Sequence, residues 1–457
     1  MFHRRQYMVE LLVVCSLLFA CTPSTAAPFI ESGPMNGFST PKEVAVWARL
    51  SSEVPARIRY WTSKNPGATT VRNLNLSGRD GRTASTVLTD LPPGERFGYE
   101  IELKHNGRWL KQPSKGPLRF QTQVIWQRRS DPPDFSLAFG SCAYINDTNV
   151  DSTTAPPYGG GYEIFETIAQ TDPDLMLWLG DAVYLRPADW ASSAGIHRRY
   201  RHARRLPDLQ ALLGRTHHYA IWDDHDYGPN DADWTFVHKG SSLKTFREFW
   251  MNPSYGLPET AGVFTQFSWS DADFFLLDNR YHRSSSAAPD GHDKTQLGET
   301  QLRWLLDALT TSRATFKVVV GGGQFLSPYD RWEGYAQFAY ERDRLLDELR
   351  RRKVEGVFFL SGDRHHAELV KVRPDGFYPL FDFTSSPLTS RGASASGELD
   401  SPVRIDGTLV TKKRNFGMLH FSGVGPERQV LMETKDANGK RLWSHIIKAS
   451  ELRFSQP

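Results

Sequence analysis

The chain has 457 residues, of which 39% are hydrophobic and 12% aromatic, which suits a globular protein of about two domains. Positive and negative side chains are interspersed and nearly balance, with a net charge of +3, so nothing indicates specificity for nucleic acid. No segment approaches the ~20 consecutive apolar residues of a membrane-spanning helix.

Residues 1–26 are predicted to be a secretory signal peptide. Arg4 and Arg5 precede an apolar run at residues 11–20, and small residues surround the expected cleavage site. We therefore expect an exported protein, periplasmic or extracellular. Two alternatives stay open. The arginine pair also fits a twin-arginine signal loosely. Cys21 could instead be the processed residue of a lipoprotein and carry a lipid anchor, although the bulky Phe19 fits a lipoprotein cleavage site poorly.

Residues 27–124 are predicted to form a small all-β sandwich. Apolar and polar residues alternate at residues 44–50, 56–60 and 85–88, and Pro-Gly and Asn-Gly turn signals separate these runs. This region lacks a convincing cluster of catalytic residues, so packing, positioning or surface attachment is its expected role. The polar residues 123–134, with two adjacent prolines, are a predicted linker.

The region from residue 135 to 450 is predicted to be a mixed α/β domain. Leucines on one face predict helices at residues 301–309 and 342–350. Helices alternating with buried strands predict stacked sheets covered by helices. The predicted strands are residues 135–139, 175–179, 218–222, 274–277, 316–320 and 357–360.

Four of these strands are each followed by a short polar cluster. The carboxyl ends of strands in an α/β sheet are where ligands bind, so these clusters are expected to converge. Carboxylates that hold two cations about 3.5–4 Å apart would form a hydrolytic centre there. The clusters are Ser141-Cys142, Gly180-Asp181-Ala182-Val183-Tyr184, Asp223-Asp224-His225-Asp226 and Asp363-Arg364-His365-His366.

Several of these side chains could have a structural role instead of a chemical one. Cys142 is the one cysteine left after cleavage, so the mature chain forms no internal disulfide; it is either a buried inert thiol or a metal ligand. The carboxylates at residues 223–226 repel one another unless cations neutralise them or solvent screens them. His225 is a candidate proton donor to a leaving oxygen. Spacing places His365 on the same face as Asp363, whereas Arg364 would point away unless the loop turns.

The order and content of the clusters resemble the PhoD-like alkaline phosphatases of the calcineurin-like metallophosphoesterase superfamily. The resemblance extends over nearly the whole mature chain and includes residues 91–94, 97–99, 277–281, 297–301 and 384–387. It implies an α/β (α+β) fold: a four-layer metallophosphoesterase-type β-sandwich flanked by helices at residues 135–450, preceded by a fibronectin III-like sandwich.

The resemblance also implies a set of metal ligands. Cys142 stands where the superfamily has an opening Asp-x-His motif, and Asp224 stands where it has an asparagine. The family is associated with Fe³⁺ and Ca²⁺: cysteine and tyrosine suit the iron, and carboxylates suit calcium. The implied metal ligands are Cys142, Asp181, Tyr184, Asp224, Asn230, Asp363 and His365, with Asp181 as the bridging carboxylate.

The functional hypothesis is an exported metal-dependent phosphoester hydrolase, an alkaline phosphatase that uses a metal-activated hydroxide. Asp181 and His225 are its predicted catalytic residues, and Arg364 or Arg280 would contact the phosphate, unless either is a surface salt-bridge residue. The substrate would be a small-molecule or lipid phosphoester. The alternatives are a phosphodiesterase or phospholipase D-type hydrolase, and a non-catalytic surface-binding protein on a decayed phosphatase scaffold.

Overall fold

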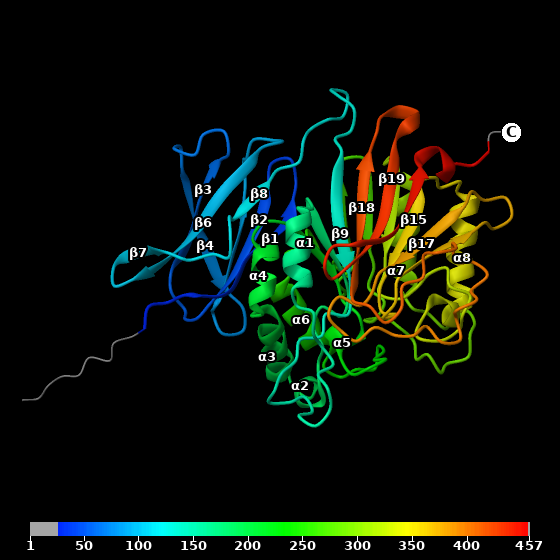
Figure 1. Ribbon diagram of the computed structural model, residues 1–457, viewed down its shortest axis with the longest axis horizontal. Helices are drawn as coiled ribbons and strands as arrows, with labels where there is room; N and C mark the ends of the chain where they lie inside the picture. Colours follow the sequence, from blue (N-terminus) through cyan, green and yellow to red (C-terminus); the bar gives the residue numbers. More distant parts are fainter. Residues whose placement is uncertain (1–25, 456–457) are drawn as a thin grey trace, which may run out of the picture.

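The computed structural model describes residues 26–455. The predicted signal peptide, with its twin-arginine and lipoprotein motifs, lies outside this range except for its last residue. Within the described range, every helix is too short or too polar to cross a membrane. The strands of the N-terminal region lie at one end of the molecule and the larger helix-covered sheets lie at the other (Figure 1).

The N-terminal region folds into two β-layers around its own core. Val46, Ile58 and Ile101 are fully buried between the layers, as the alternating pattern of the sequence predicts. One strand, β4, pairs with a strand of each layer. The strands are β1 (Ile30–Ser39), β2 (Val44–Leu50), β3 (Ala56–Thr62), β4 (Thr70–Ser77), β5 (Thr83–Leu88), β6 (Arg96–His105), β7 (Arg108–Lys111) and β8 (Arg119–Gln121).

The larger region contains two stacked sheets of six strands each. The central strands of both sheets run parallel. The first sheet has the order β20 (Arg441–Lys448), β19 (Gln429–Asp436), β18 (Asn415–Ser422), β9 (Phe135–Gly140), β10 (Leu175–Leu179) and β11 (His217–Ile221). The second has the order β12 (Thr265–Trp269), β13 (Ala272–Leu276), β14 (Phe316–Val320), β15 (Val357–Ser361), β17 (Leu380–Thr384) and β16 (Glu368–Val372).

Strand β10 explains why the central strands are apolar throughout. Leu177 packs into the core between the sheets, whereas its neighbours Met176 and Trp178 pack against helices on the outer face. A strand buried on both faces loses the alternation that marks a half-exposed strand. The outer helices complete the four predicted layers: α1 (Ile164–Thr171), α3 (Ser193–Arg204), α4 (Gln210–Leu213) and α6 (Lys239–Phe249) on the first sheet, and α7 (Glu299–Thr311) and α8 (Ala339–Arg351) on the second.

The predicted fold class is confirmed, but the sequence pattern predicted only some of the helices. Both leucine stripes are helices, α7 and α8. Helix α3 was not predicted because its buried face includes Arg199 and Arg204 beside Ile196 and Tyr200, so no apolar stripe marks it.

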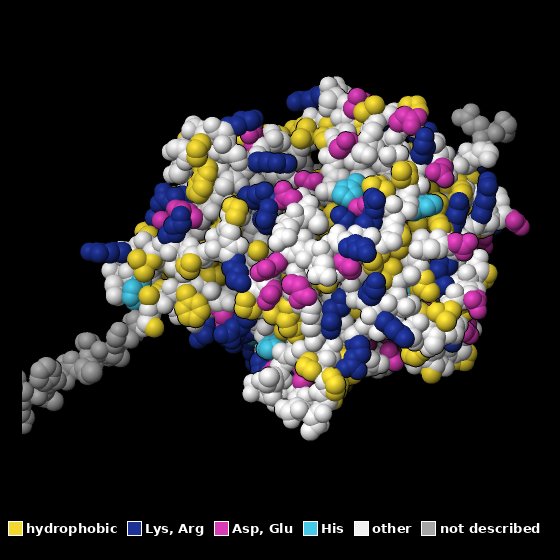
Figure 2. Space-filling view, viewed as in Figure 1, with side chains coloured by type: hydrophobic (Ala, Val, Ile, Leu, Met, Phe, Trp, Pro, Cys, Tyr) yellow, Lys and Arg dark blue, Asp and Glu magenta, His cyan; other side chains and the backbone are white. Residues whose placement is uncertain are grey.

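Lys and Arg side chains are scattered among Asp and Glu over the face shown in Figure 2.

The two regions share one continuous sheet. Strand β1 of the N-terminal region pairs in parallel with β11, with Asn36 opposite His217. The ring of His217 lies 2.8 Å from the carbonyl oxygen of Gly37 through Nδ1, and the backbone N–H of Ser39 donates to the Tyr219 hydroxyl at 3.0 Å. The sandwich therefore extends the first sheet of the larger region.

A buried ion-pair network ties the same junction together. The Arg49 guanidinium, on β2, is fully buried and pairs with Glu31 at 2.9 Å, with Asp80, and with Glu248 of α6 at 3.6 Å. Glu248 also accepts a hydrogen bond from Thr83 at 2.8 Å and lies 3.0 Å from His197. This carboxylate therefore connects strands of the sandwich to two helices of the larger region.

We expect Glu248→Gln to lower the free energy of unfolding by about 2–4 kcal/mol at pH 7, because it breaks a buried charged network. Burial alone would raise the pKa of Glu248, but His197, Thr83 and the Arg79 N–H lower it below the usual value. The stabilisation is therefore complete above about pH 4.5 and is lost as the pH falls through the folded-state pKa. Denaturant unfolding at several pH values checks this, with the exposed Glu259→Gln as control. A loss of free energy of unfolding in Glu248→Gln that does not change with pH would contradict this prediction.

Candidate metal centre

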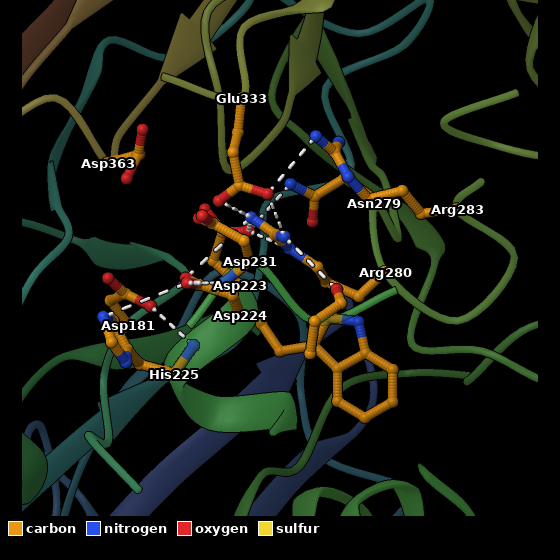
Figure 3. A network of polar contacts seen from close by, with 12 residues as sticks. Asp181, Asp223, Asp224, His225, Asp231, Asn279, Arg280, Arg283, Glu333 and Asp363 are labelled. Carbon is orange, nitrogen blue, oxygen red and sulfur yellow. Dashed lines mark hydrogen bonds and ion pairs between the residues drawn. The ribbon is translucent and has the colours of Figure 1, made fainter. Parts of the chain in front are cut away.

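The polar clusters after β9, β10, β11 and β15 meet at one edge of the stacked sheets. Ser141 accepts the backbone N–H of Asp363 at 3.0 Å, which joins the end of the first sheet to the end of the second. Gly180 permits close contact between the turns after β10 and β11, since a Cβ there would lie 2.5 Å from the Cβ of Asp223. Figure 3 shows Asp181, Asp224 and Asp363 arranged around a common space.

The backbone at this edge adopts an uncommon conformation. Cys142, Asp181, Asp363 and His365 all have positive φ angles, of 60°, 52°, 65° and 54°. This left-handed region is uncommon for residues other than glycine, although Asp, Asn and His adopt it more readily than most, and such residues concentrate at functional sites. The chain therefore turns sharply at each of these four positions.

One half of the cluster has sulfur, phenol and imidazole donors. The Cys142 sulfur lies 3.7 Å from Oδ2 of Asp181 and receives a hydrogen bond from the Ser386 hydroxyl at 3.1 Å. Nε2 of His365 lies 3.3 Å from the Tyr184 hydroxyl. Nδ1 of His365 lies 2.8 Å from the Arg391 carbonyl oxygen. A carbonyl can only accept, so Nδ1 carries the proton and Nε2 faces the cluster as a free ligand.

The other half is acidic. Ligand atoms of Asp181, Asp224 and His225 all lie within 4.8 Å of one another, and so do those of Asp224, Asp231 and Glu333. Asp224 belongs to both groups. Oδ1 of Asp181 accepts the backbone N–H of His225 at 3.2 Å. The arrangement thus offers oxygen donors on both sides of Asp224.

The buried acidic groups of this cluster favour the binding of cations. Burial raises the pKa of Asp181 well above its usual value, and the charges of Asp224 and Cys142 raise it further. Burial, with Asp223 and Glu333, raises the pKa of Asp363 to about 8. Burial likewise raises the pKa of the Cys142 thiol to about 12. Bound cations would reverse all three shifts, so the residues fit a metal centre.

The structure corrects the expected position of Arg280. Its side chain is only 1% exposed and donates to Asp223 and to both oxygens of Glu333, at 2.6 and 3.0 Å. Arg283 lies 3.3 Å from the same glutamate. Figure 3 shows Arg280 directed inward between these carboxylates. Arg280 is therefore a buried countercharge, because its hydrogen bonds are already committed to protein groups and not open to a substrate phosphate.

Arg364 also differs from its expected role. Its guanidinium donates to both oxygens of Glu398, at 2.8 and 2.9 Å, and so is committed to a protein carboxylate. Asn230 is exposed, and its side chain makes no hydrogen bond within the described residues; its neighbour Asp231 belongs to the acidic group instead. His366 is buried against Glu368 at 3.3 Å.

Sequence reasoning assigned no role to four residues at this site. Ser386 lies in residues 384–387 of the family resemblance, and Tyr158 and Glu333 lie in residues 158–162 and 332–335, two segments with Gly and aromatic residues that are candidate loops around the mouth of the site. No pattern distinguished these three residues within their segments. Tyr158 and Arg391 lie at the exposed side of His365: the Tyr158 hydroxyl is 3.3 Å from Nδ1, and the Arg391 guanidinium lies 5.6 Å from the centre of the Tyr158 ring. Arg391 is exposed and makes no ion pair within residues 26–455, so its charge is open to a substrate.

Comparisons with known proteins identify a family for this chain. The model of the PhoD-like phosphatase family matches residues 137–426. Alkaline phosphatase D of Bacillus subtilis (strain 168) is 25% identical over 339 residues, which cover 62% of this chain and 55% of that protein. The match therefore spans about half the length of this curated relative.

Solved structures share the fold. A structure of PhoD superposes with a TM-score of 0.73 at 16% identity, covering 95% of this chain and 93% of that one. The purple acid phosphatase PPD1 from yellow lupin seeds gives a TM-score of 0.67 at 11% identity, covering 92% of this chain and 74% of that one. With the family model matching more than half of its residues, the chain belongs to the PhoD-like phosphatase family.

Proposed function

We propose that this protein is an exported, metal-dependent phosphoester hydrolase, most active as an alkaline phosphatase on monoesters. The convergence of Cys142, Asp181, Tyr184, Asp224 and His365 on one buried point carries the proposal. Family membership supports hydrolysis of a phosphoester, and the relative named alkaline phosphatase D supports the choice of monoesters. Export rests on the predicted signal peptide, with a lipid anchor if Cys21 is the processed residue.

Two or more cations would bind here, with Fe³⁺ and Ca²⁺ as the proposed pair. Cys142, Tyr184 and His365 would hold the iron, Asp181 would bridge, and carboxylates including Asp224 and Asp363 would hold calcium. When bound, such cations acidify water and neutralise charge on a phosphoryl group.

The proposed proton donor to the leaving oxygen is His225. Its imidazole is 23% exposed, lies 3.9 Å from the Asp224 carboxylate and stacks on the Tyr184 ring at 4.3 Å between centres. A partly exposed imidazole beside the cluster is placed to pass a proton to the leaving oxygen. Arg391 is the proposed phosphate contact, in place of Arg364 and Arg280, because its guanidinium is exposed, forms no ion pair within residues 26–455 and lies 5.6 Å from the centre of the Tyr158 ring, whose hydroxyl is 3.3 Å from Nδ1 of His365.

Arg391→Ala is expected to raise KM for a phosphomonoester by about tenfold with a smaller change in kcat, because a charge-assisted hydrogen bond to phosphate is lost. Steady-state kinetics of the metal-loaded protein measure it. Arg373→Ala, which removes another exposed guanidinium on the loop after β16, is the control. An unchanged KM in Arg391→Ala would remove this residue from the proposed site.

The alternatives are a phosphodiesterase or phospholipase D-type hydrolase, and a non-catalytic binding protein. The deciding experiment measures hydrolysis of an aryl phosphomonoester and the matching diester by the purified mature chain loaded with iron and calcium, beside chelator-treated protein. Metal-dependent turnover with monoester preferred supports the proposal, and diester preference selects the first alternative. Folded, metal-loaded protein that binds phosphate but turns over neither ester selects the second.

A further inference from the structure

A cavity of about 450 Å³ opens directly beside the candidate metal centre. Asp363 and His365 form one of its walls, so a group bound at the metals would have this cavity next to it. Trp332 and the segment from Ala393 to Ser396 also line it. A phosphate alone is far too small to fill such a space, which leaves room for the organic group of an ester.

The walls away from the metal centre are mainly apolar. Trp332, Ala393 and Ala395 are their apolar residues, and Ser394 and Ser396 add two hydroxyl groups without charge. Arg364 also lines the cavity, but its charge is neutralised by Glu398 at 2.8 Å. His366 is likewise turned to a buried glutamate. Away from Asp363 and His365, the lining residues therefore offer no unpaired charge to a second phosphate, and the cavity favours hydrocarbon.

Trp332 is held in place although it is 61% exposed. Trp332 and Glu333 both have positive φ angles, of 53° and 58°, so the chain reverses sharply between them. Glu333 points inward to the buried Arg280, which leaves the indole outside. Arg331 lies 3.3 Å from Glu398, a carboxylate that is 1% exposed and also binds Arg364. This one carboxylate thus fixes the Trp332 loop to the facing wall.

We propose that this cavity is a specificity pocket for an apolar group on the phosphoester, aryl or alkyl, with Trp332 as its principal contact. The inference rests on the proposed phosphoester hydrolysis and adds the substrate class. An exposed tryptophan held at the edge of an uncharged pocket is where apolar area would be buried on binding.

Alkylphosphonates, which are not hydrolysed, test the pocket through binding rather than turnover. The dissociation constant of the metal-loaded protein, measured by calorimetry, is expected to fall about threefold per methylene from methyl- to butylphosphonate, or roughly 30-fold in total. Phenyl- and hexylphosphonate then show whether aryl or alkyl groups fit better. Equal affinity along the series, or no binding of any member, would overturn the pocket.

Trp332→Ala is expected to reduce the 30-fold increase in affinity from methyl- to butylphosphonate to about fivefold or less, whereas Trp332→Phe should retain most of this increase. Tyr340→Ala, which removes an exposed aromatic ring on α8 outside the pocket, serves as the matched control. An undiminished gain in Trp332→Ala would also overturn the proposal. If affinity rises with chain length but no ester is hydrolysed, the pocket is supported and the proposed hydrolase activity is refuted. If esters are hydrolysed but affinity does not depend on chain length, the hydrolase activity is supported and the pocket is refuted.

Discussion

Asp181→Asn is expected to lower kcat for a phosphoester by at least about 10³-fold and to lower metal content. Asp181 lies between the sulfur of Cys142 and the acidic group around Asp224, so it is the side chain placed to serve cations on both sides. Asparagine tolerates the positive φ at this position, so the backbone should be retained. Turnover and elemental analysis of the purified variant measure both effects.

The same substitution should have the opposite effect on the metal-free protein. Burial and the charges of Asp224 and Cys142 oppose ionisation of Asp181, so a neutral amide is expected to raise the free energy of unfolding by on the order of 1 kcal/mol. Asp382→Asn is the control: this buried carboxyl accepts two N–H groups from residues 325 and 326 through one oxygen, which an amide retains. Near-normal metal content in Asp181→Asn would refute the bridging role.

Cys142→Ser is expected to lower activity by about 100-fold or more and to deplete iron while calcium is retained. A serine hydroxyl gives up its proton far less readily than a thiol, so it is a much poorer ligand for iron than the cysteine thiolate. Serine keeps the size of the side chain and suits the hydrogen bond from Ser386, so metal-free stability should change by less than about 1 kcal/mol.

Elemental analysis and thermal unfolding of the metal-loaded and metal-free variants measure the outcome of Cys142→Ser. Ser386→Ala removes a hydroxyl from the same pocket but leaves the sulfur in place, and it should retain iron. If Cys142→Ser holds iron at the wild-type level, Cys142 is the buried inert thiol that the sequence also allows.

The convergence of the four clusters could be predicted because it follows from strand direction. Parallel strands bring their carboxyl ends to one edge, so the residues after β9, β10, β11 and β15 meet there whatever the detail of each turn. Spacing also predicts that Asp363 and His365 share a face and that Arg364 points away unless the loop turns; Asp363 and His365 both have positive φ angles, so the loop does turn, and Arg364 lines the same cavity as both residues. Periodicity and strand order are local properties that a sequence displays.

The roles of the arginines could not be predicted, because they depend on partners far along the chain. Arg280 is neutralised by Glu333, 53 residues later, and Arg364 by Glu398, 34 residues later. No spacing rule connects such pairs. Arg391 is the converse case: it lies in an unremarkable polar segment, and its place beside His365 arises from the path of the loop.

The continuous sheet sets a limit on how far this protein can be shortened. The family match begins at residue 137, yet β11 has β10 on one side and β1 of the sandwich on the other. A chain beginning near that residue would keep the pairing of β11 with β10 but would expose the edge of β11 that faces β1 at His217. Such an open edge pairs readily with the same edge of another molecule and leads to aggregation. The N-terminal sandwich thus also protects the solubility of the region that carries the metal centre.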